Sequence, residues 1–278
     1  MKDVRVFYRW SLILVLISIG LYGCNSRPAY NPPTLTAQAV RARDMATRIA
    51  IDLRGTDDWE QKQIEATSQA FQESLKSNEN WPLIMSESFD QNTDIWPTGS
   101  DEGSFANASW EIAEGKYRWQ AEAKDAFVWW AYPDMDAVAD FYLSADSEQI
   151  SGPTDGEWGL VYRVTPDDEY YLFEINARQE YCVYLHQGDE WEALVNWTPS
   201  DVIQMDQVNK LAVIAQGTQF LFFINDQFIT QLSDDRLEAG NTGVLIGLSN
   251  AEDQGVWEFD NFNLRSPDLP EPTQTPSP

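Results

Sequence analysis

Hydrophobic and polar side chains alternate with a period of two over most of residues 83–264. Short runs of this kind, bounded by Gly, Asn, Asp and Pro, are typical of β-strands. The predicted strands are Leu83–Phe89, Trp110–Ile112, Tyr117–Glu122, Phe127–Ala131, Ala137–Ser144, Trp158–Val164, Tyr170–Asn176, Tyr181–His186, Trp191–Val195, Leu211–Gln216, Gln219–Ile224, Phe228–Leu232, Gly243–Leu248 and Val256–Leu264. No window of helical periodicity interrupts them, so the pattern predicts an all-β domain of two antiparallel sheets packed as a sandwich.

Short turns predict how neighbouring strands pair. Gly217-Thr218 is typical of a two-residue hairpin turn, which would place Val213 opposite Phe222. Asn225-Asp226 predicts a second hairpin, because Asn and Asp tolerate a positive φ. These two turns join consecutive strands of one predicted sheet.

A third turn, Thr165–Asp168, would place Val164 opposite Glu169 and thereby assigns the faces of two central strands. The face predicted to lie in the core carries Trp158, Leu160, Tyr162, Tyr171, Phe173 and Ile175. The reverse face combines apolar side chains with an arginine, a carboxylate and a phenol, and it carries Val161, Arg163, Tyr170, Leu172 and Glu174.

A different hydrophobic pattern stands at the start of the chain. Basic residues precede an apolar run over residues 10–22, which is too short to cross a bilayer and is typical of a secretory signal peptide. The run ends in Leu21-Tyr22-Gly23-Cys24, which resembles the lipobox of bacterial lipoproteins, although Tyr22 departs from the usual small or β-branched residue. The resemblance implies a signal peptide over residues 1–23 and a lipid on Cys24. An uncleaved membrane anchor is the alternative.

The segments around the sandwich differ from it in composition. Residues 24–33 are polar and contain proline, which predicts a tether close to the membrane. Parts of residues 34–80 show helical spacing, which predicts a helical stalk, with a docking helix for a partner as the alternative. The sandwich is expected over residues 81–265, and the Pro/Thr-rich tail over residues 266–278 is predicted to be disordered.

The chain is strongly acidic, with a formal net charge of −27. From Trp81 to Arg265, 8 Lys and Arg residues oppose 34 Asp and Glu residues, which leaves a net charge of −26. Such a surface repels phosphate backbones, so the composition excludes nucleic acid as a partner. It also gains nothing from anionic lipid headgroups, so membrane attachment is expected through the lipid anchor alone.

Cysteine usage points to no catalytic thiol. If Cys24 carries lipid, Cys182 has no partner within the chain for a disulfide. His186, the one histidine, lies four residues along the same predicted strand, which is more than about 10 Å at roughly 3.3 Å per residue. That distance is too long for proton transfer, so Cys182 is predicted to be a buried, inert thiol.

Six segments, taken in order, resemble the strands of concanavalin A-like lectin and glucanase sandwiches, with laminin-G-like and 3-keto-disaccharide hydrolase-type domains as the nearest branches. They are Trp158–Arg163, Tyr170–Ile175, Asn209–Val213, Phe222–Asp226, Gly243–Gly247 and Phe259–Phe262. The resemblance implies a jelly-roll with a concave face or loop rim for saccharides. The chain departs from it at Arg178-Gln179, where such domains commonly have Asp-Gly, so a wider turn is expected there.

The same resemblance tests for hydrolysis. Retaining glucanases of this fold carry a Glu-x-Asp-x-x-Glu strand, because one carboxylate acts as nucleophile and the other as acid. The nearest match is Glu258-Phe259-Asp260-Asn261-Phe262-Asn263, in which Asn263 replaces the acid and cannot donate a proton. We therefore predict no catalytic residues, and we expect Glu258 and Asp260 to face solvent.

Carboxylates also raise the question of calcium. Asp90, Asn92, Asp94 and Asp101 imitate the spacing of a calcium loop, but Ile95 stands where that loop requires glycine. We predict a polar connection there rather than a metal site. No cofactor is expected, although the sequence leaves open a structural calcium among other loop carboxylates, such as Asp155, Glu157, Asp167 and Asp168.

Aromatic residues are the stronger indication of a ligand. Trp129 and Trp130 are adjacent in one predicted strand, so one of them must leave the core face. Indole rings stack on sugar C–H groups, although most tryptophans simply pack in cores. The predicted ligand-binding residues are Arg163, Tyr170, Glu174, Trp191, Trp129 and Trp130. An equally good interpretation is that Arg163 and Glu174 form a structural ion pair on the face of the sheet.

These patterns together predict an extracytoplasmic lipoprotein on a bacterial cell surface. Its sandwich is expected to bind a glycan or other saccharide without catalysis. A glycoside hydrolase acting on 3-keto-disaccharides is one alternative, and a protein-binding or adhesion module without a sugar site is another.

Overall fold

A computed structural model describes residue 70 and residues 73–267. The predicted signal peptide, the lipidation residue Cys24, the tether, most of the stalk and most of the tail lie outside these residues. The described residues form fifteen β-strands in two antiparallel sheets, and residues 73–78 are helical. The prediction of an all-β two-sheet sandwich is therefore confirmed. No helix in the described part of the chain is long and apolar enough to cross a membrane.

The larger sheet has nine strands in the order β13-β12-β11-β6-β15-β4-β3-β2, with β1 also paired to β15. These strands are β1 (Leu83–Glu87), β2 (Gly99–Glu102), β3 (Ala106–Ala113), β4 (Lys116–Ala123), β6 (Phe141–Ser151), β11 (Asn209–Gln216), β12 (Gln219–Ile224), β13 (Gln227–Ser233) and β15 (Gln254–Arg265). One side of β15 pairs with β6, and its other side pairs with β4 and then with β1.

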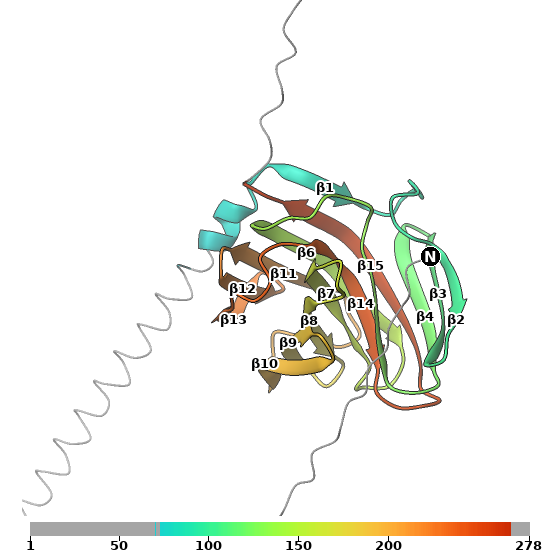
Figure 1. The fold of residues 1–278 in the computed structure, drawn as a ribbon. Coiled ribbons are helices and arrows are strands. Elements are labelled where there is room, and N and C mark those ends of the chain that lie inside the picture. The colour runs from blue at the N-terminus through green and yellow to red at the C-terminus, as the bar shows by residue number, and fades with distance from the viewer. Residues whose placement is uncertain (1–69, 71–72, 268–278) are drawn as a thin grey trace, which may run out of the picture. The chain divides into compact units, whose positions relative to one another are not determined.

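The smaller sheet has six strands in the order β10-β9-β8-β7-β14-β5. They are β5 (Phe127–Ala131), β7 (Glu157–Val164), β8 (Tyr170–Asn176), β9 (Glu180–Gln187), β10 (Glu190–Pro199) and β14 (Asn241–Leu248). Figure 1 shows the two sheets as layers, with β7 to β10 in front of β6 and β11.

The core lies between the two sheets and is rich in aromatic side chains. The larger sheet supplies Trp119, Phe141, Phe222 and Trp257, among others. The smaller sheet supplies all six residues of the predicted core face of β7 and β8, so that prediction is confirmed. Burying alternate side chains of both layers removes a large apolar area from water, which is the main force that stabilises such a fold.

The predicted strand registers are confirmed where the turns are short. Val213 lies opposite Phe222, and Gly217 in the turn between them has a φ of 55°. The turn Asn225-Asp226 has positive φ at both residues, as expected of a tight hairpin. The turn between β8 and β9 is wider, as expected, because Asn176 and Glu180 enclose three residues.

Several strands differ from the prediction in their bounds, and β2 and β6 differ most clearly. β2 was not predicted, since Gly99–Glu102 has no hydrophobic residue and all four residues are exposed at the edge of the sheet. It forms through backbone hydrogen bonds to β3, which composition does not reveal. β6 begins four residues later than predicted, at Phe141, because Val138 forms only an isolated bridge to Gly240.

The outer face of the larger sheet carries a small apolar cluster under the helical residues 73–78. Leu75 packs there against Tyr142, Ile214 and Phe223. Just beyond the helix, the Glu79 carboxylate accepts a hydrogen bond from the Tyr142 hydroxyl at 3.0 Å and pairs with Lys210 at 3.1 Å. These contacts attach the segment before the sandwich to the face opposite the six-stranded sheet.

Candidate functional site

An aromatic pocket of about 480 Å³ lies at one end of the sandwich, beside β5. Its lining comes from β3, β4, β5 and three connections between strands. The lining residues are Asp94, Ile95, Trp96, Pro97, Trp110, Trp119, Trp129, Trp130, Ala131, Tyr132, Asp134 and Asp168. Five tryptophans and a tyrosine around one hollow are unusual on a protein surface, and we call this hollow the aromatic pocket.

The tryptophans of the pocket form a packed wall. Trp110 stacks on Trp119, with ring centroids 5.3 Å apart and an angle of 23° between the planes. Trp110 also packs against Trp129 at 5.4 Å. Trp119 and Trp129 are buried in the core, whereas Trp110, Trp130 and Tyr132 are half-buried. The wall is therefore rigid behind and presents aromatic surface in front.

Trp129 and Trp130 face opposite ways, as the alternation along β5 predicts. Trp129 is 4% exposed and belongs to the core, while Trp130 packs with the apolar cluster on the outer face of the six-stranded sheet. Both rings nevertheless border the aromatic pocket, because the pocket lies at β5, the edge strand of the six-stranded sheet. One strand therefore contributes both a structural and an accessible indole.

An aromatic row runs from the pocket across the outer face of the six-stranded sheet. Trp130 contacts Tyr170, with ring centroids 4.3 Å apart, and Tyr170 stacks on His186 at 4.9 Å. His186 contacts Trp191 at 4.8 Å, and Trp191 contacts Tyr184 at 6.3 Å. The structure thus brings together three predicted site residues, Trp130, Tyr170 and Trp191, and adds His186, which the sequence analysis did not assign to the site.

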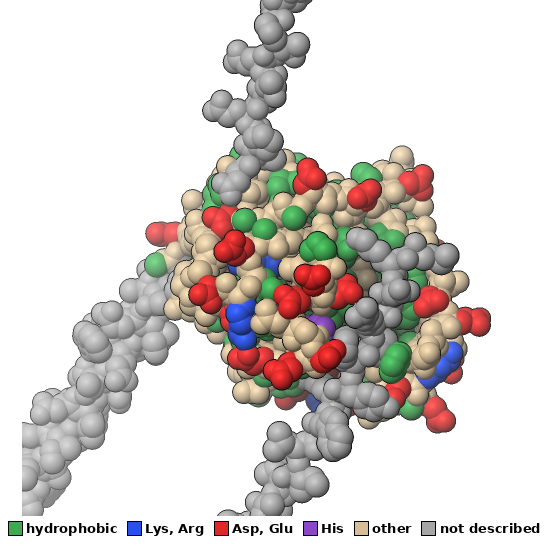
Figure 2. Space-filling view, in the orientation of Figure 1, with side chains coloured by type: hydrophobic (Ala, Val, Ile, Leu, Met, Phe, Trp, Pro, Cys, Tyr) green, Lys and Arg blue, Asp and Glu red, His purple; other side chains and the backbone are tan. Residues whose placement is uncertain are grey.

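Three carboxylates border the aromatic pocket, namely Asp94, Asp134 and Asp168. The Asp134 amide donates to the Ile95 carbonyl at 3.1 Å, which ties two connections of the pocket together. The Asp168 carbonyl accepts from His186 Nδ1 at 2.9 Å, which anchors the β7–β8 turn to the aromatic row. No lysine or arginine of the described residues lines the pocket. Figure 2 shows the same imbalance over the face in view, where red carboxylates outnumber blue side chains.

Arg163 lies apart from the other predicted site residues. Its φ is 51°, at a point where the β7–β14 register shifts by one residue. The guanidinium donates to the carbonyls of Leu237 at 2.6 Å, Ala139 at 3.0 Å and Gly217 at 2.7 Å. It also lies 4.7 Å from the centroid of the Phe220 ring and is 1% exposed. The bulge turns this side chain toward loops of the larger sheet, where it has a structural role.

Glu174 lies on the outer face of β8, as predicted, and is buried. Its carboxylate accepts a hydrogen bond from the Cys182 thiol at 3.3 Å. The ion pairs of the described residues do not include one between Arg163 and Glu174, because the bulge separates the two side chains. Cys182 is fully buried, as its strand position predicts.

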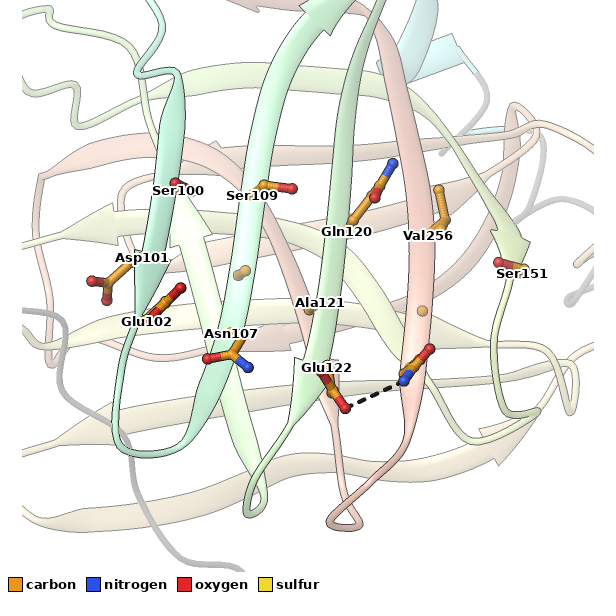
Figure 3. Close-up of a pocket in the computed structure, with 13 residues that line it drawn as sticks. Ser100, Asp101, Glu102, Asn107, Ser109, Gln120, Ala121, Glu122, Ser151 and Val256 are labelled. Carbon is orange, nitrogen blue, oxygen red and sulfur yellow. Dashed lines mark hydrogen bonds between the residues drawn. The ribbon is translucent and has the colours of Figure 1, made fainter.

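A second hollow, of about 410 Å³, lies on the outer face of the larger sheet and differs in chemistry. Figure 3 shows Ser100, Ser109 and Gln120 side by side on β2, β3 and β4, with Glu102 and Glu122 nearby. We call it the polar trough. It contains no aromatic side chain, so a ligand there would depend mainly on hydrogen bonds, whose net gain over those to water is small. The aromatic pocket is the better candidate site.

The segment that most resembles a glucanase strand lies in β15 and is engaged in ion pairs. Glu258 pairs with Arg118, and Asp260 pairs with Lys116. Neither carboxylate lines the aromatic pocket. Both carboxylates connect neighbouring strands of the larger sheet instead.

The acidic segment that imitates a calcium loop makes local hydrogen bonds. The Asp90 carboxylate accepts from the Ser88 hydroxyl at 2.8 Å, and the Asn92 amide oxygen accepts from the Asp94 backbone at 2.9 Å. Asp101 lies in β2. Within the described residues, no group of three or more potential metal ligands is found.

Comparisons with known proteins concern the fold. No protein-family model and no curated protein matches the chain. A Bacillus subtilis protein of unknown function with a galectin-like fold aligns at a TM-score of 0.50, with 13% identity over 66% of this chain and 96% of that one. This similarity supports a shared fold alone.

Other solved structures with similarity to the chain score slightly lower. A carbohydrate-binding module from Bacillus subtilis aligns at a TM-score of 0.48, with 16% identity over 62% of this chain and 96% of that one. The catalytic domain of a laminarinase from Thermotoga petrophila aligns at 0.48, with 10% identity over 68% of this chain and 99% of that one.

Replacing Arg163 tests whether it stabilises the sandwich. We expect Arg163→Met to lower the free energy of unfolding by about 3–5 kcal/mol, because three carbonyls lose a charged donor in a buried place. Arg178→Met is the matched control, since Arg178 is exposed in its ion pair with Asp155 and should cost less than about 1 kcal/mol. Urea unfolding followed by tryptophan fluorescence measures both, and equal losses would contradict the structural role of Arg163.

The burial of His186 predicts how the stability of the folded protein changes with pH. Burial lowers its pKa below the usual value of 6.5, against smaller opposing effects of Asp168, Asp189 and Glu169. Between the folded and unfolded pKa values the unfolded chain binds more protons, so this group's contribution to stability rises with pH up to about 6.5 and falls as the pH drops below it. NMR titration of this one histidine should give a folded pKa below 6.5, and a pKa at or above 6.5 would refute the prediction.

Proposed function

We propose that the sandwich binds a saccharide without catalysis and that the ligand occupies the aromatic pocket. The observation that supports this best is the half-buried Trp110, Trp130 and Tyr132 around a hollow of about 480 Å³. That volume is within the usual range for small-ligand sites. Flat aromatic faces complement the C–H faces of sugar rings, and the carboxylates at the rim can accept hydrogen bonds from sugar hydroxyls.

The aromatic row favours a ligand longer than one sugar. Tyr170, His186 and Trp191 continue from Trp130 in unbroken ring contact along the outer face of the six-stranded sheet. A longer saccharide would meet the half-buried Trp130 and Trp191, which flank the buried Tyr170 and His186.

The proposal of binding without hydrolysis rests on how the acidic residues are used. Hydrolysis of a glycosidic bond needs two carboxyl groups that flank one bond, one of them able to donate a proton. In the segment that most resembles a glucanase strand, Glu258 and Asp260 are engaged by Arg118 and Lys116, and Asn263 cannot donate. A binding role is therefore better supported than a catalytic one.

We further propose that the protein is a lipoprotein held at the cell surface by Cys24. The support comes from the basic start, the short apolar run and the tetrapeptide that resembles a lipobox. The acidic sandwich has little attraction for anionic lipids, so such an anchor would hold it near the membrane without drawing it onto the surface.

Removal of one indole tests the proposed site. We expect Trp130→Ala to weaken saccharide binding by about tenfold or more, because the ligand loses an aromatic face at the centre of the site. Trp81→Ala is the matched control, since Trp81 is also half-buried but packs on the outer face of the larger sheet. A glycan array should first identify a ligand, and isothermal titration calorimetry should then compare both variants with the wild type.

The outcomes separate the competing functions. Absence of any binding at millimolar saccharide would overturn the proposal and favour an adhesion module. Release of products from 3-keto-disaccharides or glucans would show a hydrolase instead. Equal loss of affinity in Trp130→Ala and Trp81→Ala would place the site elsewhere.

The anchor is tested separately by mass spectrometry of the mature N-terminus. We expect a chain that begins at Cys24 and carries the added mass of its acyl chains. Cys24→Ala should abolish both the added mass and the recovery of the protein in the membrane fraction. An unmodified Cys24 in the wild type would refute the lipoprotein assignment.

A further inference from the structure

The three carboxylates of the aromatic pocket are not engaged by the protein. No ion pair of the described residues includes Asp94, Asp134 or Asp168, and their carboxylate oxygens accept no hydrogen bond there. Their backbone groups, in contrast, hold the surrounding connections in place. The charges are therefore positioned by the backbone and left available to a ligand.

The lysines and arginines of the sandwich are used elsewhere. On the outer face of the larger sheet, Lys116 pairs with Asp260, and Arg118 pairs with Glu258. Arg236 pairs with Asp234 and Glu192, while Arg163 binds backbone carbonyls. Within the described residues, the pocket carboxylates thus have no counter-charge, although other carboxylates of the domain form ion pairs.

One buried indole behind the pocket lacks a hydrogen-bond acceptor. Trp96 lines the aromatic pocket and is 2% exposed, yet its Nε1–H has no acceptor among the described residues. A buried donor without a partner is costly and uncommon in a native protein. The Nε1 atom of Trp96 is closed to solvent, as are those of Trp119, Trp158 and Trp257, which also lack an acceptor among the described residues, so this donor belongs to the packed core behind the pocket.

We propose that the aromatic pocket selects saccharides with free amino groups, such as oligomers of glucosamine, over neutral sugars, and that it rejects uronic acids and sulfated sugars. This inference rests on the proposed saccharide binding. A protonated amine in the pocket gains attraction from these three residues, of which Asp94 and Asp134 are exposed and Asp168 is half-buried, and it can also lie over an indole face. The same carboxylates repel an anionic sugar.

The test compares ligands of matched shape. Calorimetry at pH 6 and low salt should show a β-1,4-linked glucosamine tetramer binding at least about tenfold more tightly than cellotetraose, with no binding of a β-1,4-linked glucuronate tetramer. At 0.5 M salt the advantage should shrink severalfold, because ions screen the charges, whereas cellotetraose binding should change little. Equal affinity for the glucosamine and glucose tetramers would overturn the inference but leave the proposed function intact. Failure of every saccharide to bind would overturn both.

Matched variants separate a local effect from the overall acidity. The triple variant Asp94→Asn, Asp134→Asn, Asp168→Asn should lose most of its preference for glucosamine while still binding cellotetraose. The control triple variant Asp101→Asn, Glu102→Gln, Glu122→Gln changes the net charge by the same amount but lies in the polar trough, and it should keep the preference. An equal loss in the two triple variants would assign the effect to general surface charge and overturn the inference.

Discussion

Burial of alternate side chains between the two sheets is the constraint on which the rest of the structure depends. Each strand has only two faces, so every residue directed into the core fixes its neighbours as outward-facing. In β5 this rule places Trp129 in the core and leaves Trp130 half-buried outside it. The candidate site therefore combines core tryptophans with an indole that the core could not take up.

The tryptophans of the aromatic pocket also show how a rigid core supports a ligand surface. Trp119 and Trp129 are held by core packing, and Trp110 stacks against both at 5.3 and 5.4 Å. A ligand that meets such a wall orders few side chains on binding, which lowers the entropic cost of association. The hydrogen bond from the Asp134 amide to the Ile95 carbonyl restrains the neighbouring connections in the same way.

Charge is distributed unevenly between the larger sheet and the aromatic pocket. The larger sheet balances carboxylates of β15 with Lys116 and Arg118, which join adjacent strands. The aromatic pocket has three carboxylates and no basic side chain among the residues that line it. The domain has a net charge of −26 between residues 81 and 265, so the positions of its few basic side chains decide where negative charge is neutralised. Because no basic side chain lines the pocket, the charge of the pocket favours cationic over anionic ligands.

The sequence by itself determined the two-layer sandwich, the short hairpins and the core faces of β7 and β8, because hydrophobic alternation and turn residues act over a few positions. It also showed that one member of the Trp129/Trp130 pair must leave the core. Only the tertiary structure decided which one, and it moved Arg163 away from the site through a backbone bulge that no local pattern marks. The placement of Asp94, Asp134 and Asp168 around one pocket was equally hidden, because they lie on three connections far apart in the chain and come to line the same hollow only when the strands between them pair.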